Sequence, residues 1–332
     1  MRATKNTWNE LLELNSLREL SRRLGSDRLL VQASSGNTSM KIDDTLWIKA
    51  SGKWLVDAEA ADFLIPVQLA RAKKCLDAQM VIPETKSSGG FSASIETAMH
   101  AVLPHKVIVH VHSVNAIAWA VREDAPTQLS HRLSGLAWQW LPYTRSGADL
   151  ARKIGDICLR CPQTNVLILG NHGLVVCGES CDSAKQLLAE VERRLKIDMR
   201  PAPECAEIQA LATDPISRRI LSGGVLYPCQ ALFLPSTVRL PEDSPLKQLA
   251  FFRQRRMPLL IDDHGVFCSS DMTSAEREML VGFANVVQRI HPSAPIRYLS
   301  FSEVLDVLNV DSENYLRVAT RSGISKADSL GA

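Results

Sequence analysis

The chain has 332 residues, of which 45% are hydrophobic and 22% are charged, enough for one large domain or two ordinary domains with a sizeable core. The formal net charge of +2 argues against a nucleic-acid-binding scaffold and against an acidic tail. No apolar run reaches the roughly 18 residues of a membrane span, and the N-terminus lacks the apolar segment of a signal peptide. We therefore expect a cytoplasmic protein that binds neither nucleic acid nor a membrane.

The eight cysteines of the chain need an interpretation. The spacings of Cys158 with Cys161 and of Cys177 with Cys181 could suggest a four-cysteine zinc site. However, Cys158 and Cys161 lie in a helical pattern in which a separation of three residues is an ordinary core spacing. We therefore expect reduced thiols, the form typical of a chain without an export signal.

The first predicted element is a helix from Thr7 to about Leu24, because Thr7 and Glu10 have the spacing of a capping box. The polar, glycine-rich segment 83–92 is expected to be a loop. Between them, turn residues separate three short predicted strands: 29–32, 37–42 and 45–49.

The middle of the chain alternates between apolar strands and amphipathic helices. In chain order we expect helix 94–102, strand 106–112, helix 114–121, strand 138–141, helix 147–161, strands 165–169 and 174–177, and helix 183–197. Because strands that meet in hairpins alternate with helices, we predict an α/β fold with a central, mainly antiparallel sheet and helices on its faces.

The proline-containing segment 201–204 indicates a linker between a domain at 1–203 and a smaller α/β domain at 206–332. The smaller domain repeats one pattern of the larger: an apolar strand, a His-Gly turn at His264, a short strand and a helix. We interpret this region as a degenerate half-repeat of the larger domain. We expect no metal site in it, because His264 has no His-x-His pair as a partner. Convergence on one strand–turn–helix pattern is the alternative.

Three histidines have the spacing of a metal site. His110 and His112 are two residues apart in a predicted strand, so both side chains lie on one face of the sheet. His172 follows another apolar strand, in a tight turn. Three imidazoles leave one position open for water or substrate, as catalytic zinc sites do. The alternative is that His110 and His112 are a chance pair on a half-buried strand.

Glu96, which precedes these histidines, is the candidate proton-transfer group. We expect burial beside a metal ion to shift its pKa towards the working range. The alternative is that Glu96 interacts only with the dipole of its own helix. His100 lies one turn further along the same helix face, and we expect it to be packed rather than functional.

Two glycine-containing turns are candidates for binding an anionic substrate. Their backbone N–H groups and short hydroxyls suit a phosphate or a carboxylate. Nearby cationic side chains could add charge, although exposed lysines on a hairpin are usually only solvated. The candidate substrate-binding residues are Ser35, Gly36, Asn37, Lys49, Ser51, Gly52, Ser94 and Arg145, with Lys53 beside them.

Five motifs occur in a fixed order along the chain: Ser34-Ser35-Gly36-Asn37-Thr38-Ser39, Ile48-Lys49-Ala50-Ser51-Gly52, Ser94-Ile95-Glu96-Thr97-Ala98-Met99-His100, His110-Val111-His112 and Asn171-His172-Gly173-Leu174. Together they resemble the class II aldolase/adducin family, which includes the fuculose- and rhamnulose-phosphate aldolases. The resemblance covers about residues 7 to 197. It implies a three-layer α/β/α domain of class II aldolase type, followed here by the additional C-terminal domain.

The resemblance also implies an activity: a metal-dependent lyase, of aldolase type, that cleaves or forms a C–C bond in a small anionic ketose-like or sugar-acid substrate. The reaction would pass through a metal-stabilised enediolate with Glu96 as acid/base. We expect one divalent ion per chain, zinc ahead of manganese or cobalt. Asn37, Ser51, Gly52 and Ser94 match the family's phosphate-binding positions. The aldolases that the chain resembles are tetramers, so we expect a homo-oligomer, tetramer ahead of dimer.

The chain departs from the sugar-phosphate aldolases at three places, the first being a shorter helix between Glu96 and His110 than in fuculose-phosphate aldolase. Ile95 stands where they carry a second serine of the phosphate pocket. Their proton-donating tyrosine has no match near Gln128 to His131. A decarboxylase, an epimerase or a dehydratase of the same family therefore remains an alternative, as does an adducin-like binding protein without catalysis.

Overall fold

The computed structural model describes residues 2–60, 62–77, 90–200, 207–234, 236–238, 259–262 and 264–309. The chain divides into two compact units. One unit comprises Met1–Ser113 with Leu133–Arg194, and the other comprises Val114–Arg132 with Leu195–Ala332. The domain boundaries at 1–203 and 206–332 stay a prediction, and the candidate linker 201–204 lies outside the described residues.

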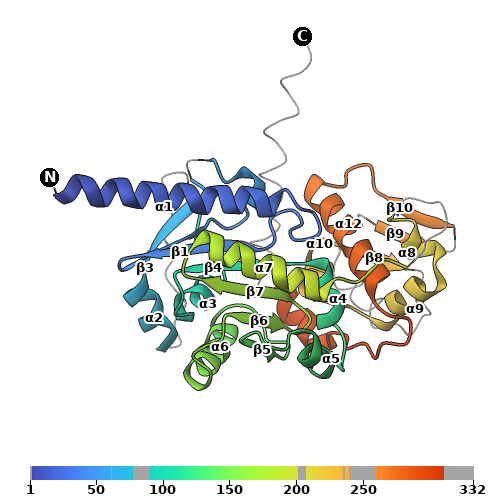
Figure 1. The fold of residues 1–332 in the computed structure, drawn as a ribbon. Helices are drawn as coiled ribbons and strands as arrows, with labels where there is room; N and C mark the ends of the chain where they lie inside the picture. The colour runs from blue at the N-terminus through green and yellow to red at the C-terminus, as the bar shows by residue number, and fades with distance from the viewer. Residues whose placement is uncertain are drawn as a thin grey trace, which may run out of the picture. The chain divides into compact units, whose positions relative to one another are not determined.

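A seven-stranded sheet forms the centre of the first unit, with strand order β3-β2-β1-β4-β7-β6-β5 (Figure 1). All neighbouring strands are antiparallel except β5 and β6, which confirms the predicted mainly antiparallel sheet. The strands are β1 (Asn37–Ile42), β2 (Thr45–Lys49), β3 (Leu64–Gln68), β4 (Val107–Val111), β5 (Trp138–Leu141), β6 (Val166–Leu169) and β7 (Gly173–Gly178).

Helices cover both faces of this sheet. On β1, Thr38 hydrogen-bonds Ser21 of α1, whereas Ser39 hydrogen-bonds His100 of α3, so α1 and α3 lie on opposite faces. The helices of this unit are α1 (Arg2–Gly25), η1 (Leu55–Asp57), α2 (Leu69–Asp77), α3 (Thr97–Val102), α6 (Ala148–Arg160) and α7 (Cys181–Leu195). The predicted α/β fold with a helix–sheet–helix arrangement is therefore confirmed.

The core of the first unit lies between the sheet and the helices α3 and α6. Met99 and Ile154 pack there against Ile108 and Val175 of the two central strands. Every residue of β4 and of β7 is buried, so these strands form a rigid, water-free support. The candidate metal ligands lie at the end of these strands.

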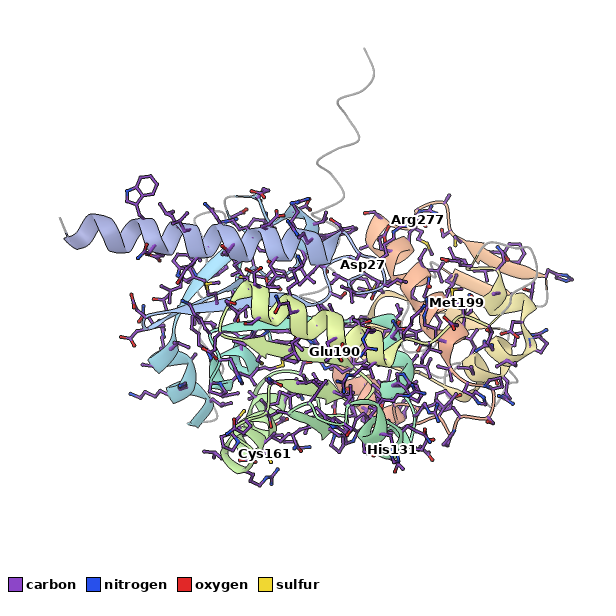
Figure 2. All side chains as sticks on the ribbon, viewed as in Figure 1. Asp27, His131, Cys161, Glu190, Met199 and Arg277 are labelled. Carbon is purple, nitrogen blue, oxygen red and sulfur yellow. The ribbon has the colours of Figure 1, made fainter. Side chains whose placement is uncertain are left out.

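Glu190, which Figure 2 labels on the outer face of α7, forms ion pairs within its own helix.

Some predicted elements differ from the structure. The predicted strand at 29–32 is wrong, because Leu30 and Val31 bond back to Asp27 in a turn. The helix predicted from Thr7 begins at Arg2, so Thr7 does not cap it. Strand β3, which contains Pro66, was not among the predicted strands. Proline is tolerated there because β3 is an edge strand.

The second unit combines helices with a three-stranded sheet of order β10-β9-β8. Its helix α4 packs against α12, whose first turn carries a capping box formed by Thr273 and Glu276. The elements are α4 (Val114–Ala120), α5 (Ala125–Arg132), α8 (Ala210–Thr213), α9 (Pro215–Gly223), α10 (Pro228–Phe233), β8 (Ser236–Val238), β9 (Leu259–Asp262), β10 (Gly265–Cys268) and α12 (Ser274–Arg289).

The two sheets share one local arrangement. Strand β9 is parallel to β8 and antiparallel to β10, as β6 is parallel to β5 and antiparallel to β7. His264 lies between β9 and β10 and is exposed, whereas the corresponding His172 is buried. This likeness is what a half-repeat would give, and the interpretation as a degenerate copy stays a prediction.

The expectations of reduced thiols and of no membrane span can be compared with the described residues. Six cysteines in the described part of the chain are free thiols, among them Cys158, Cys161, Cys177 and Cys181. Cys177 is buried, whereas the other three are partly exposed. Among the described residues, no helix is both long enough and apolar enough to cross a membrane.

Candidate metal centre

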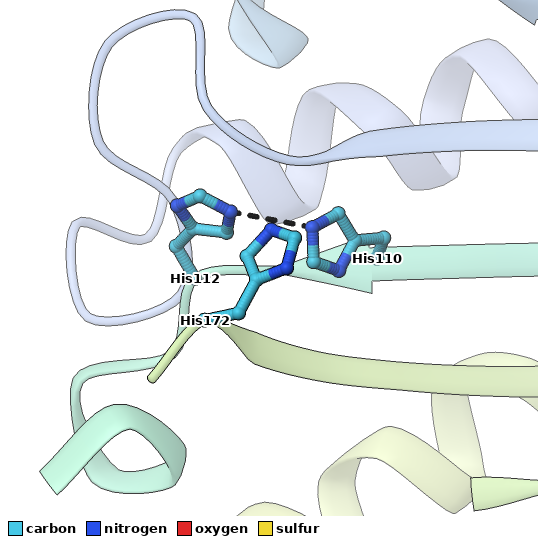
Figure 3. Close-up of side chains that lie close together, drawn as sticks. All are labelled: His110, His112 and His172. Carbon is cyan, nitrogen blue, oxygen red and sulfur yellow. Dashed lines mark hydrogen bonds between the residues drawn. The ribbon is translucent and has the colours of Figure 1, made fainter. Parts of the chain in front are cut away.

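The imidazoles of His110, His112 and His172 converge on one point (Figure 3). The ring centroid of His110 lies 5.0 Å from that of His112 and 4.9 Å from that of His172, and the remaining pair is 5.2 Å apart. Candidate ligand nitrogens of all three lie within 4.8 Å of one another. The spacing and the buried, neutral-donor character of this set fit one small divalent cation, with a position left open.

Strand pairing explains why these histidines meet. His110 lies in β4, His112 follows directly after it, and β4 pairs with β7, where His110 faces Val175. The turn between β6 and β7 carries His172 back to the same end of β4. The predicted same-face placement of His110 and His112 therefore holds, with their Nε2 atoms 3.2 Å apart.

The turn that presents His172 has two special backbone positions. Asn171 has a φ of 50°, in the left-handed region that asparagine tolerates better than most residues. At Gly173, a Cβ atom would lie 2.7 Å from the Val111 carbonyl oxygen and 3.3 Å from the rings of both His110 and His112. Gly173 is therefore needed so that the turn can approach the other two histidines.

The protonation of the histidines suits a cation. The Nδ1–H of His110 can donate to the Leu174 carbonyl oxygen over 3.1 Å, which leaves the lone pair of Nε2 directed into the site. Burial lowers the pKa of His172 to about 4 and lowers the pKa of His112 well below its usual value. Both rings are therefore neutral at pH 7, as metal ligation requires.

Glu96 lies at the edge of the three histidines. Its carboxylate oxygens are 3.5 Å from His110 Nε2 and 3.4 Å from His172 Nε2. Asn37, which pairs with His110 across β1 and β4, donates its Nδ2–H to Glu96 Oε2 over 2.7 Å. Glu96 is the N-cap residue of α3, but its side chain makes no capping hydrogen bond. The side chain is directed to the site instead.

The pKa of Glu96 moves in the direction opposite to our expectation. Burial alone would raise it, but the imidazoles of His110, His172 and His112, which act in this way only when they are protonated, and the Asn37 hydrogen bond outweigh burial and lower the pKa. The downward direction follows from Asn37, because its N–H group stabilises the charged carboxylate. Glu96 is therefore ionised at pH 7 and able to accept a proton.

The first glycine-containing turn lies next to this carboxylate, and the second bonds the segment that precedes Glu96. Gly36, with a φ of 64°, brings the start of β1 so close to β4 that a Cβ atom would lie 2.7 Å from the His110 carbonyl oxygen. Asn37 also donates to the Ser94 hydroxyl over 3.3 Å. The Ser51–Gly52 turn joins the same region, since Ser51 N–H donates to the Ser92 carbonyl over 2.8 Å.

Several candidate substrate ligands bind protein groups instead. Lys49 is buried and donates to the carbonyls of Ser34 at 2.9 Å and Lys53 at 2.7 Å, which fastens the two turns together. Burial lowers its pKa to about 7. The Ser35 hydroxyl accepts the N–H of Gln32 at 3.1 Å. Lys53 forms an ion pair of 2.9 Å with Asp62.

The structure also shows where three further residues lie, of which the sequence analysis had considered two. Arg145, a candidate for anion binding, is exposed, whereas its neighbour Ser146, which sequence reasoning missed, donates to Glu96 Oε1 over 3.4 Å. No local pattern could have found Ser146, because 50 residues separate it from Glu96. His100 is fully buried and bonds Ser39 over 2.7 Å, as expected of a packed residue.

Comparisons with known proteins identify one family for this chain. Residues 15–199, more than half of the chain, match the family described as the class II aldolase and adducin N-terminal domain. A Bacillus subtilis (strain 168) protein named uncharacterized oxidoreductase YuxG is 26% identical over 273 residues, which are 74% of this chain and 36% of that protein. This chain thus spans about a third of the length of that relative.

Two solved structures are similar to part of the chain. The N-terminal class II aldolase domain of a Thermoplasma acidophilum protein is 24% identical, with a TM-score of 0.48, over 55% of this chain and 92% of that one. The L-fuculose-1-phosphate aldolase from Thermus thermophilus is 19% identical, with a TM-score of 0.40, over 55% of this chain and 91% of that one. On the strength of the match over residues 15–199, the chain belongs to the class II aldolase and adducin family.

Proposed function

We propose that this chain is a divalent-metal-dependent lyase that cleaves or forms a C–C bond in a small anionic ketose-like or sugar-acid molecule. The observation that supports this proposal best is the buried carboxylate of Glu96, which lies within 3.5 Å of two of three converging, buried imidazoles. A cation site beside a potential base is the combination that enolate chemistry requires.

His110, His112 and His172 would hold the cation, for which zinc is our first candidate and manganese or cobalt the next. A bound divalent ion supplies a Lewis acid that stabilises negative charge as it develops on substrate oxygens. The neutral imidazoles would offer their nitrogen lone pairs from the buried end of the sheet, so the side chains would need little rearrangement to bind the ion.

Glu96 would transfer the proton. In cleavage Glu96 would accept the proton of the substrate hydroxyl as the C–C bond breaks, and would then give this proton to the carbon beside the carbonyl group from which the bond was lost. In bond formation the same two transfers would run in reverse. Asn37 orients the carboxylate by holding Oε2 at 2.7 Å. Because Glu96 is only 5% exposed, bulk water has little access to the transferred proton.

The substrate anion would be read by the Ser51–Gly52 turn and by the Ser94 hydroxyl, with Gly36 and Ser35 shaping the adjoining turn. Lys49 would support these turns through its bonds to the carbonyls of Ser34 and Lys53, while the exposed Arg145 would offer positive charge to a ligand. These residue roles, a cytoplasmic location and a homo-oligomer, tetramer ahead of dimer, are proposals based on the sequence and on family membership.

The test combines metal analysis with a substrate screen. The purified protein should contain one divalent ion per chain, and His110→Ala/His112→Ala should lose it. Metal-stripped protein, reloaded with zinc, manganese or cobalt, is then screened for carbonyl products from ketose phosphates and sugar acids. An intact protein that binds no metal contradicts the proposal and favours an adducin-like binding role. Metal binding with loss of CO₂ or with epimerisation instead favours those reaction types.

A further inference from the structure

Ser146 contacts Glu96 from the turn between β5 and α6. Its side chain is half-buried, and its hydroxyl donates to Glu96 Oε1 over 3.4 Å. The same carboxylate oxygen lies 3.4 Å from His172 Nε2. Ser146 therefore adjoins the one oxygen of Glu96 that Asn37 does not hold.

The two oxygens of Glu96 have matched surroundings. Oε2 accepts from Asn37 at 2.7 Å and lies 3.5 Å from His110 Nε2. Oε1 accepts from Ser146 and lies beside His172. Each oxygen thus has one neutral hydrogen-bond donor and one imidazole, and the Ser146 contact is the longer of the two hydrogen bonds.

A carboxylate lone pair that accepts a hydrogen bond is less available to a cation. Oε1 lies 3.4 Å from His172 Nε2, so a cation held by the three imidazoles would have Oε1 among its nearest oxygens. If Oε1 were held firmly by the cation, Glu96 would be a poorer proton acceptor for a substrate.

We propose that Ser146 is a positioning residue that competes with the bound cation for Oε1 and thereby keeps Glu96 available for proton transfer. The inference rests on the proposed function, since it requires a cation at the three imidazoles. The contact of 3.4 Å exceeds the usual O–H···O length, so the competition is modest. Its loss should change cation affinity about two- to tenfold, the range of one ordinary hydrogen bond.

The experiment measures the affinity of metal-free protein for Co²⁺ by competition with a chelator. Ser146→Ala should bind Co²⁺ about two- to tenfold more tightly, because Oε1 is freed. The same substitution in a Glu96→Gln background should change the affinity by less than about twofold, because an amide is a poor ligand for the cation. Ser146→Thr keeps the hydroxyl and should retain the affinity of the unaltered protein.

The control is Ser130→Ala, which removes an exposed hydroxyl that bonds Thr127 on α5. Equal effects of Ser146→Ala with and without Glu96 would overturn the inference, and so would no effect in either background or a threonine variant that behaves like alanine. Ser146→Val, which has the shape of the threonine variant but no hydroxyl, replaces the alanine variant if that variant does not fold. Failure of the unaltered protein to bind Co²⁺ would instead contradict the proposed function itself.

Discussion

At the scale of single residues, the carboxylate of Glu96 is contacted from four separate segments of the chain. Asn37 and Ser146 donate hydrogen bonds to it, and His110 and His172 lie beside it. Only the Asn37 contact, at 2.7 Å, is short. The side chain is therefore oriented by one short hydrogen bond, while its other oxygen has only the longer contact with Ser146, which suits the proposed proton transfer.

Replacing Glu96 by glutamine keeps the shape of the side chain but removes its basicity. Because the three imidazoles remain, Glu96→Gln should keep its metal content. Turnover of the true substrate should fall by about 10²–10⁴-fold, the usual contribution of a positioned acid/base. Elemental analysis and kcat provide the measurement, and an unchanged kcat would exclude a role in the rate-limiting proton transfer.

Binding of the substrate anion can be separated from catalysis at the Ser51 turn. Ser51→Ala removes a hydroxyl but no hydrogen bond of the Ser51 N–H group, which donates to Ser92. KM for the anionic substrate should rise more than KM for an uncharged analogue, with kcat little changed. Equal losses on both compounds would show that the turn shapes the fold without reading the anion.

His100 predicts how stability responds to acid. Burial lowers its pKa from 6.5 to about 3 in the folded protein. Below pH 6.5 the unfolded chain therefore binds a proton that the folded chain rejects, so His100 lowers the free energy of unfolding as the pH falls towards 3. Above pH 6.5 it has no such effect.

The matched variant is His100→Asn, which keeps a polar group near Ser39 but does not titrate. Urea unfolding at about pH 7.5 and about pH 4.5 should show a smaller loss of stability on acidification for this variant than for the unaltered protein. Identical pH dependence of the two proteins would show that His100 is protonated, or solvated, in the folded state.

At the scale of elements, the β6–β7 turn decides whether the metal site can form. It must bring His172 to the end of β4, and Gly173 permits the approach. Gly173→Ala places a Cβ atom 2.7 Å from the backbone of Val111, where no flexible side chain can move away. The variant should not hold the proposed metal ion and should lose about 1–3 kcal/mol of stability, the usual cost of overpacking a core.

Gly155 provides the control for that substitution. It lies within α6, and a Cβ atom there would meet nothing within 4 Å. Gly155→Ala should keep the metal and gain up to about 1 kcal/mol, because alanine has the higher helix propensity. The measurement compares the metal content and the Tm of the two variants with those of the unaltered protein. A Gly173→Ala protein with full metal content would contradict the geometry of the turn.

At the scale of the whole molecule, the chain enters the second unit before the first is complete. Helices α4 and α5 lie between β4 and β5 in sequence, yet they belong to the unit that contains α12. All residues of α4 are buried. The indole N–H of Trp119 donates to the Leu195 carbonyl over 2.9 Å, and the Asn115 side chain accepts from the N–H of Ile197. These hydrogen bonds also fix α4 within this unit.

Truncation tests this organisation. A fragment 1–203 ends at the domain boundary that the sequence predicts but lacks α12, the packing partner of α4. It should unfold at a lower temperature than the full chain and bind a dye for exposed apolar surface, because α4 loses its cover. A fragment with the Tm and the metal content of the full chain would show that residues 1–203 form an independent domain.

The sequence by itself determined the features that depend on local periodicity. The two-residue spacing of His110 and His112 places both on one face of any strand, and a His-Gly turn after an apolar strand can present a third ligand. Glycine at Gly36 and Gly173 marked turns that the structure uses for close backbone approach. Ordered motifs of this kind also identified the family. The capping-box pattern at Thr7 misled, because the helix extends beyond it.

Only the tertiary structure decided which partners these side chains take. Lys49 and Lys53 have the charge of anion ligands, but one bonds backbone carbonyls and the other pairs with Asp62. Ser146 reaches Glu96 because α6, which follows it, packs against α3, and α4 joins the second unit because α12 covers it. Such contacts join segments distant in sequence, and they depend on how strands order in the sheet, which no local pattern encodes.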